Sequence, residues 1–143
     1  MLKDQHTEIN SSLRTVEWKD NKVIMIDQTK LPNQLVFVEY DDYNQVADAI
    51  RTLVVRGAPA IGVSGAFGLA LASLQSKATT KDELISDLEK ARKILYDTRP
   101  TAVNLKWGLD KIMTVANSES TVEQIKQSVI NEAKNSQPSS SLV

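Results

Sequence analysis

Cysteine is absent from the 143 residues, histidine occurs once, and aromatic residues make up only 5% of the chain. Without cysteine, disulfides, thiolate catalysis and Cys-ligated metals are excluded within these residues. The single histidine, His6, stands in a polar segment without ligand-type neighbours at metal-binding spacing. We expect it to lie in a frayed, solvated terminus. The sequence therefore predicts no metal site and no cofactor.

A surplus of either charge is also lacking. Lys and Arg number 17 and Asp and Glu number 18, for a formal net charge of -1. This balance favours neither nucleic acid nor an anionic membrane as a partner, and the aromatic residues are too few for a base-stacking platform. The first residues are polar, so no secretory signal is visible and we expect a cytoplasmic location.

The most unusual stretch is an uncharged run of small residues at 57–76, placed between Arg56 and Lys77. Pro59 predicts a helix start, because its missing N–H is one of the donors that a first turn leaves unpaired. Three glycines recur in the run at every third position: Gly62, Gly65 and Gly68. Each costs a helix about 1 kcal/mol relative to alanine, so we expect another backbone to pack closely against this stripe.

Gly57 and Ala58 are placed at the mouth of that helix. Free N–H groups and the positive end of the helix dipole bind anions such as phosphate there. Arg56 adds a forked cation next to them. Two other interpretations remain open for the run. It approaches the roughly 20 residues of a membrane span, and it also suits a core helix without any ligand.

A second arginine, Arg99, stands directly before Pro100. Proline restricts the preceding residue to extended conformations, and we expect Pro100 to start a new helix. One arginine near a helix end is usually only solvated. Two such arginines, Arg56 and Arg99, can clamp one phosphate between two helix mouths.

The remaining pattern predicts an α+β fold, in which a small antiparallel three-stranded sheet is followed by a bundle of about five helices. Strands are expected at 15–18, 22–27 and 35–40, with a tight turn at Asp20-Asn21. Helices are expected at 43–55, from Pro59 to about 75, after a Thr80–Glu83 capping box, from Pro100, and after a Ser120–Glu123 capping box to about 135. We expect disordered tails at 1–12 and 135–143 and one domain at 13–134.

Two motifs carry a family resemblance: Arg-Gly-Ala-Pro-Ala-Ile-Gly at 56–62 and Thr-Arg-Pro-Thr-Ala-Val-Asn-Leu at 98–105. They closely resemble those of the S-methyl-5-thioribose-1-phosphate isomerases, a superfamily shared with the alpha, beta and delta subunits of eukaryotic initiation factor 2B. Asp27-Gln28 also fits the pattern. The resemblance implies conversion of methylthioribose 1-phosphate to methylthioribulose 1-phosphate in methionine salvage. It also implies that Arg56, Gly57, Ala58 and Arg99 bind the substrate.

The same resemblance places the catalytic cysteine and the proton-donating aspartate in a Rossmann-like second domain, which would follow the last helix. It therefore implies no catalytic residue in this chain. We expect an inactive N-terminal domain of a longer isomerase, cut short by a frameshift, a premature stop or a partial gene model. Its expected partners are a sugar phosphate, the missing C-terminal domain and, in full-length form, a second copy. Asp27 and Asp97 are expected to cap or orient neighbours rather than to replace the missing acids.

Three other functions stay open. The first is a regulatory domain of the initiation factor 2B type that senses a sugar phosphate or nucleotide. The intact motif at 56–62 weighs against it, because the regulatory relatives tend to lose that motif. The second is ribose-1,5-bisphosphate isomerase, and the third is a helical interaction domain without a ligand. Loss of a companion domain would expose an apolar face, which predicts self-association.

Overall fold

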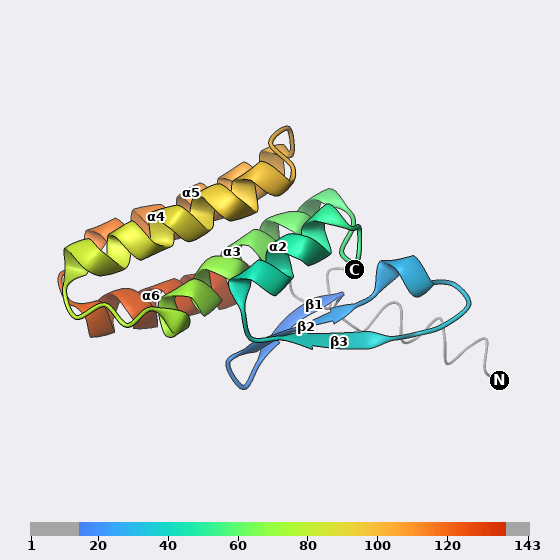
Figure 1. Cartoon of the computed structure of the whole chain (residues 1–143), viewed down its shortest axis with the longest axis horizontal. Helices are drawn as coiled ribbons and strands as arrows, with labels where there is room; N and C mark the ends of the chain where they lie inside the picture. The colour runs from blue at the N-terminus through green and yellow to red at the C-terminus, as the bar shows by residue number, and fades with distance from the viewer. Residues whose placement is uncertain (1–14, 137–143) are drawn as a thin grey trace.

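Residues 15–136 are described by the computed structural model, which has three antiparallel strands in the order β1-β2-β3 and five α-helices in that range. The predicted fold class is confirmed (Figure 1). The strands are β1 (Val16–Lys19), β2 (Lys22–Ile26) and β3 (Phe37–Tyr40), with a short 3-10 helix, η1 (Gln28–Lys30), after β2. The helices are α2 (Tyr43–Arg51), α3 (Ala58–Gln75), α4 (Lys81–Thr98), α5 (Val103–Ser118) and α6 (Val122–Asn135). The predicted tails lie outside these residues, except that Asn135 ends α6 and Ser136 follows it.

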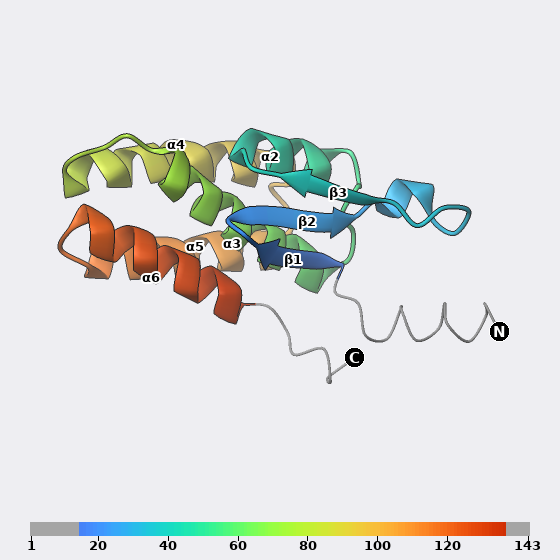
Figure 2. The ribbon, with the colours of Figure 1, turned by 90° about the horizontal axis from the view of Figure 1, so that it is seen from below.

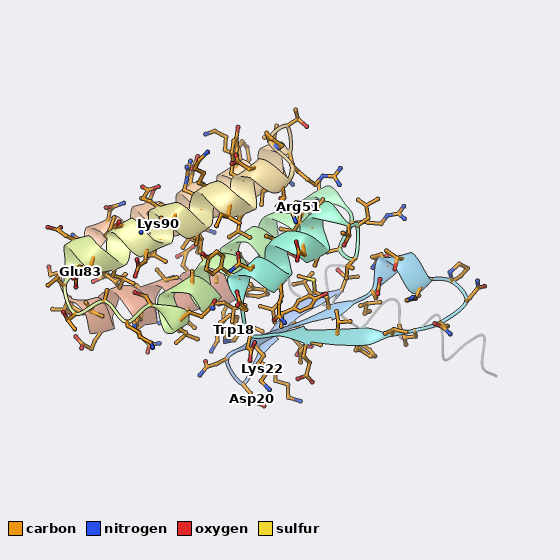
Figure 3. All side chains as sticks on the ribbon, viewed as in Figure 1. Trp18, Asp20, Lys22, Arg51, Glu83 and Lys90 are labelled. Atoms are coloured by element: carbon orange, nitrogen blue, oxygen red, sulfur yellow. The ribbon has the colours of Figure 1, made fainter. Side chains whose placement is uncertain are left out.

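The sheet packs one face against the helices. Its hairpin turn places Asp20 and Asn21 at φ 55° and 60°, the left-handed conformation that a tight turn needs, as expected. Trp18 is only 9% exposed and its ring lies 5.6 Å from that of Phe67 on α3, centroid to centroid. Figure 3 shows Trp18 on the helix side of the sheet. Trp18 therefore belongs to the hydrophobic core.

Helix α3 is the centre of the molecule. It contacts α2, α4, α5, α6, β1 and β2, and the sheet crosses one side of it (Figure 2). Every residue from Ile61 to Ser73 is buried. By length and composition α3 is apolar enough to cross a membrane, but here the other elements surround it. Its apolar character therefore fits the core-helix interpretation.

The glycine stripe of α3 serves two kinds of packing. A Cβ on Gly62 would lie 2.8 Å from the carbonyl oxygen of Asn104, so α5 approaches here with its backbone, as expected. Gly65 and Gly68 face the side chains of Leu105 and Leu95 instead. The prediction of backbone contact is therefore confirmed at Gly62 and wrong at the other two glycines.

Helix α2 ends at Arg51, four residues before the predicted end. Leu53 lies within the helix expected at 43–55, but it has φ 68° and is 41% exposed. The chain reverses at this point, and the N–H of Val54 donates back to the carbonyl of Ala49 at 3.0 Å. A tertiary contact then holds the loop, because the N–H of Gln28 donates to the carbonyl of Val54 at 2.8 Å.

The starts predicted for α5 and α6 are wrong. Pro100 does not begin α5, which starts at Val103. It occupies the second position of a β-turn, in which the N–H of Ala102 donates to the carbonyl of Arg99 at 3.0 Å. The fixed φ of proline suits this position. The last capping box is formed by Thr121 and Gln124, one residue after the predicted pair. The capping box of Thr80 and Glu83 on α4 is confirmed.

Candidate functional site

Three helix ends meet at one end of the bundle. The start of α3, the end of α4 and the start of α5 lie together there, to the upper right in Figure 1. Gly57 is the N-cap of α3 and has φ 92°, a conformation that favours glycine. Ala58 is the first residue of α3 and Pro59 the second, one position later than predicted. Both predicted helix-mouth residues therefore lie at the mouth.

A pocket of about 320 Å³ lies between these ends. This is the lower end of the range that small-ligand sites occupy. It is lined by Gly57, Ala58, Ile61, Arg99, Ala102, Val103 and Asn104. Three of the four predicted site residues are thus brought together from two distant motifs.

Arg56, the fourth predicted residue, immediately precedes Gly57 but does not line this pocket. Its side chain is exposed, whereas Arg99 is half-buried. Within residues 15–136, neither arginine forms an ion pair, although Arg51 and Arg92 pair with Asp48 and Asp110. Both guanidinium groups can therefore meet an external anion.

The two helices that open onto the pocket differ from the other three in their N-terminal caps. Side chains of Asp42, Thr80 and Thr121 cap α2, α4 and α6. No side chain caps α3 or α5. The first N–H groups of α3 and α5 are therefore free to donate to a ligand, and the dipoles of both helices favour negative charge at this position.

The two candidate acids have structural partners. Asp27 is almost buried and caps η1, accepting from the N–H of Thr29 at 2.9 Å and from its hydroxyl at 2.6 Å. Burial, followed by the charges of Asp27 and Asp48, raises the pKa of Tyr40 above its ordinary value. Asp97 is exposed and pairs with Lys93 at 3.2 Å. The capping role expected of Asp27 is confirmed, whereas Asp97 forms an exposed ion pair and caps no helix.

Groups of three or more His, Cys, Asp or Glu side chains that can hold a metal ion do not occur between residues 15 and 136. His6 lies outside that range. The prediction made for His6 therefore remains a prediction. Among the side chains that line the pocket, only Arg99 is ionisable.

A second hollow of about 320 Å³ adjoins the first between α3 and α5. Its lining includes Pro59, Val63, Trp107 and Ser136, and Asn104 lines both hollows. Trp107 is 69% exposed. Sequence reasoning missed Asn104 and Trp107 as site residues. The two residues are three positions apart, which places them together on the face of α5 opposite its apolar residues. This spacing was the available signal, but a helical period does not reveal which element lies next to that face.

Comparisons with known proteins show which family this chain resembles. The Initiation factor 2 subunit family matches residues 54–141. A methylthioribose-1-phosphate isomerase of Geobacter sulfurreducens is 45% identical over 124 residues, covering 85% of this chain and 36% of the relative. The isomerase of the same name from Citrifermentans bemidjiense is 53% identical over 105 residues, covering 73% of this chain and 30% of the relative.

Two solved structures share the fold. The 5-methylthioribose 1-phosphate isomerase of Pyrococcus horikoshii superposes with a TM-score of 0.82 at 45% identity, over 86% of this chain and 35% of that one. Subunit delta of translation initiation factor eIF-2B from A. fulgidus gives a TM-score of 0.83 at 42% identity, over 87% of this chain and 36% of that one. The chain spans about a third of the length of the relatives it matches.

Proposed function

The chain belongs to the Initiation factor 2 subunit family, and from this premise we propose that it serves in the isomerisation of S-methyl-5-thioribose 1-phosphate to the corresponding ribulose 1-phosphate in methionine salvage. Its part is to hold the phosphate of the substrate. One observation carries the proposal: Gly57, Ala58 and Arg99 line one pocket between two helix N-termini without side-chain caps. The names of the isomerase relatives support the choice of reaction.

The phosphate is bound by three kinds of group. The free N–H groups at the starts of α3 and α5 donate to its oxygens, and both helix dipoles favour its charge. Arg99 reaches it as a forked, charged donor from the pocket wall. Arg56 adds positive charge at the exposed edge beside Gly57. Phosphate anchoring holds the adjacent sugar carbons in place for proton transfer.

Proton transfer between sugar carbons needs a positioned acid or base, and it benefits from a closed cleft that excludes water. Among the side chains lining the pocket, only Arg99 is ionisable, and an arginine stays protonated. The acid and base therefore come from the part of the relatives that this chain does not match. Accordingly, the 143 residues bind substrate without converting it.

That further part of the protein covers the pocket in this proposal. Val103, which lines the pocket, is 61% exposed and Trp107 beside it is 69% exposed, so two large apolar side chains face outward at the site. Burial of such side chains by another domain is favourable. A cytoplasmic location and a homodimer of the full-length protein belong to the same proposal and are based on the resemblance alone.

The similarity to the initiation factor subunit from A. fulgidus supports a second candidate function. In it the same pocket senses a sugar phosphate or nucleotide and passes the signal to partner subunits, without chemistry. The two candidates share phosphate binding and differ in turnover. An isomerase assay of the full-length protein separates them.

Phosphate binding by the 143-residue chain is the direct test. We expect inorganic phosphate to shift the NMR signals of Gly57 and Ala58. Arg99→Ala should weaken its affinity by about tenfold or more, because a hydrogen bond to a charged group contributes about 1.5–3 kcal/mol. Arg51→Ala is the matched control, since Arg51 is an exposed arginine at a helix end that pairs with Asp48. Unchanged affinity in Arg99→Ala would falsify the proposed site.

A coupled isomerase assay tests whether the chain binds substrate without converting it. The 143-residue chain should give no turnover of methylthioribose 1-phosphate above the rate without protein. Substantial activity from this chain would overturn the proposal that its catalytic groups lie elsewhere.

A further inference from the structure

Asn104 lies where α3 and α5 come closest together. It is the second residue of α5, and its carbonyl oxygen would be 2.8 Å from a Cβ placed on Gly62. Its own Cβ lies 3.4 Å from the same point. One turn further along α5, Gly108 packs against the carbonyl of Gly62. The backbone of Asn104 is thus held by two contacts that leave no room for side chains.

The pocket has only two polar side chains in its lining, Arg99 and Asn104. Every buried side-chain nitrogen or oxygen of residues 15–136 has a hydrogen-bond partner. Asn104 is half-buried, and its carboxamide hydrogen-bonds to no residue of that range. A carboxamide in this state keeps two donors and an acceptor for a ligand.

The chemistry of the two side chains suits different parts of a sugar phosphate. A phosphate only accepts hydrogen bonds, and Arg99 with the helix N–H groups supplies donors for it. A sugar hydroxyl both donates and accepts, as a carboxamide does. Asn104 carries no charge, so it adds nothing to the attraction of an anion as such.

We infer that Asn104 is a positioning residue that hydrogen-bonds to a hydroxyl of the sugar, so that the pocket selects sugar phosphates over phosphate alone. The inference rests on the proposed function, because it assumes that the phosphate lies at Arg99. Asn104 lines both this pocket and the adjoining hollow, so it stands at the exit through which the sugar extends.

Two probes separate the sugar from the phosphate: α-D-ribose 1-phosphate and inorganic phosphate, each titrated into the 143-residue chain. We expect the wild-type chain to bind ribose 1-phosphate more tightly. Asn104→Ala should weaken the affinity for ribose 1-phosphate about fivefold, because one hydrogen bond is lost. It should leave the affinity for inorganic phosphate unchanged. Asn104→Ser keeps a donor and an acceptor and should retain part of the preference.

Asn104→Asp keeps the shape of the side chain and should lower the affinity for both probes, because a carboxylate repels the phosphate. Asn117→Ala is the control on the same helix, since the Asn117 carboxamide donates to the carbonyl of Met113 and should not affect either probe. Circular dichroism of each variant shows whether the fold is kept. If Asn104→Ala does not fold, Asn104→Ser and Asn104→Asp test the role of the side chain in its place.

The outcomes distinguish two failures. If inorganic phosphate binds without dependence on Arg99, the proposed function fails. If its binding depends on Arg99 but the preference for ribose 1-phosphate is absent, or survives in Asn104→Ala, only the role of Asn104 is overturned. Equal weakening of both probes in Asn104→Ala also overturns it, because that result indicates a structural role.

Discussion

Gly108 packs directly against the main-chain carbonyl of Gly62, so a Cβ at position 108 would overlap with that oxygen. This contact allows the backbones of α3 and α5 to touch. It brings together two helix starts that no side chain caps, and the pocket lies between them. The geometry of the candidate site therefore depends on two glycines far apart in the chain.

Gly108→Ala should destabilise the protein by about 1–3 kcal/mol, because α3 and α5 must separate to admit the methyl group. This loss is expected although alanine favours helices by about 1 kcal/mol over glycine. Urea unfolding measures the difference. Gly68→Ala is the matched control: its Cβ would lie 2.9 Å from the flexible end of Leu95, which can shift, so it should cost less. A Gly108→Ala variant as stable as the wild type would contradict the close contact.

Thr121→Ala should cost about 1 kcal/mol of stability, whereas Ser120→Ala should stay within about 0.5 kcal/mol of the wild type. The reason is that the Thr121 hydroxyl accepts from the N–H of Gln124 at 3.1 Å, while Ser120 offers α6 no side-chain cap. Thermal and urea unfolding of both variants tests this. Equal losses, or the larger loss at Ser120, would show that the cap lies elsewhere.

Trp107→Gln should leave the unfolding free energy within about 0.5 kcal/mol of the wild type and reduce self-association of the chain. The side chain is 69% exposed, so it contributes to surface contacts more than to the core. Sedimentation velocity over a range of concentrations measures the association. Trp18→Ala is the contrasting variant, since Trp18 is buried and its loss should cost about 3–5 kcal/mol. A wild-type chain that stays monomeric throughout would count against an adhesive surface at Trp107.

Asp110 should make stability depend on acid pH. Hydrogen bonds from Lys106 at 2.8 Å and Arg92 at 2.7 Å lower the pKa of Asp110 below its ordinary value of 3.8. Since the folded-state pKa is the lower one, the stabilisation is complete above about pH 5 and declines as the pH falls through 3.8 and below.

Asp110→Asn should therefore be less stable than the wild type at pH 7, and the difference between the two should shrink toward pH 3. Urea unfolding at several pH values provides the comparison. A difference that is the same at all these pH values would mean that the charge of Asp110 contributes nothing. Raised salt should reduce the effect at pH 7, because the side chain is partly exposed and its ion pairs are screened.

Features that depend on neighbouring residues could be predicted from the sequence. The hairpin turn at Asp20-Asn21 and the capping box of Thr80 and Glu83 both involve residues within four positions of each other. The apolar faces of α4 and α5 follow the same rule, because a helix repeats every 3.6 residues whatever it packs against.

The errors have one common cause, which is that a local signal fitted two structures. Proline suits the first turn of a helix and the second position of a β-turn equally well, so Pro100 did not reveal where α5 begins. Leu53, an apolar residue, suited the helix expected at 43–55, but the chain reverses at this residue and the loop is held by a hydrogen bond from η1. Neither choice can be made without the contacts that form on folding.

The sequence alone specifies the chemistry of this protein: an uncharged core helix, two arginines beside two prolines, and glycine at the positions where helices touch. The tertiary structure decides which of these groups share a pocket. It places Arg99 in the lining and Arg56 outside it, and it adds Asn104, which belongs to the motif at 98–105 but was not predicted as a site residue. The physical reason is that the positions of α3 and α5 are set by the contact of Gly62 with Gly108, between residues that the chain separates widely.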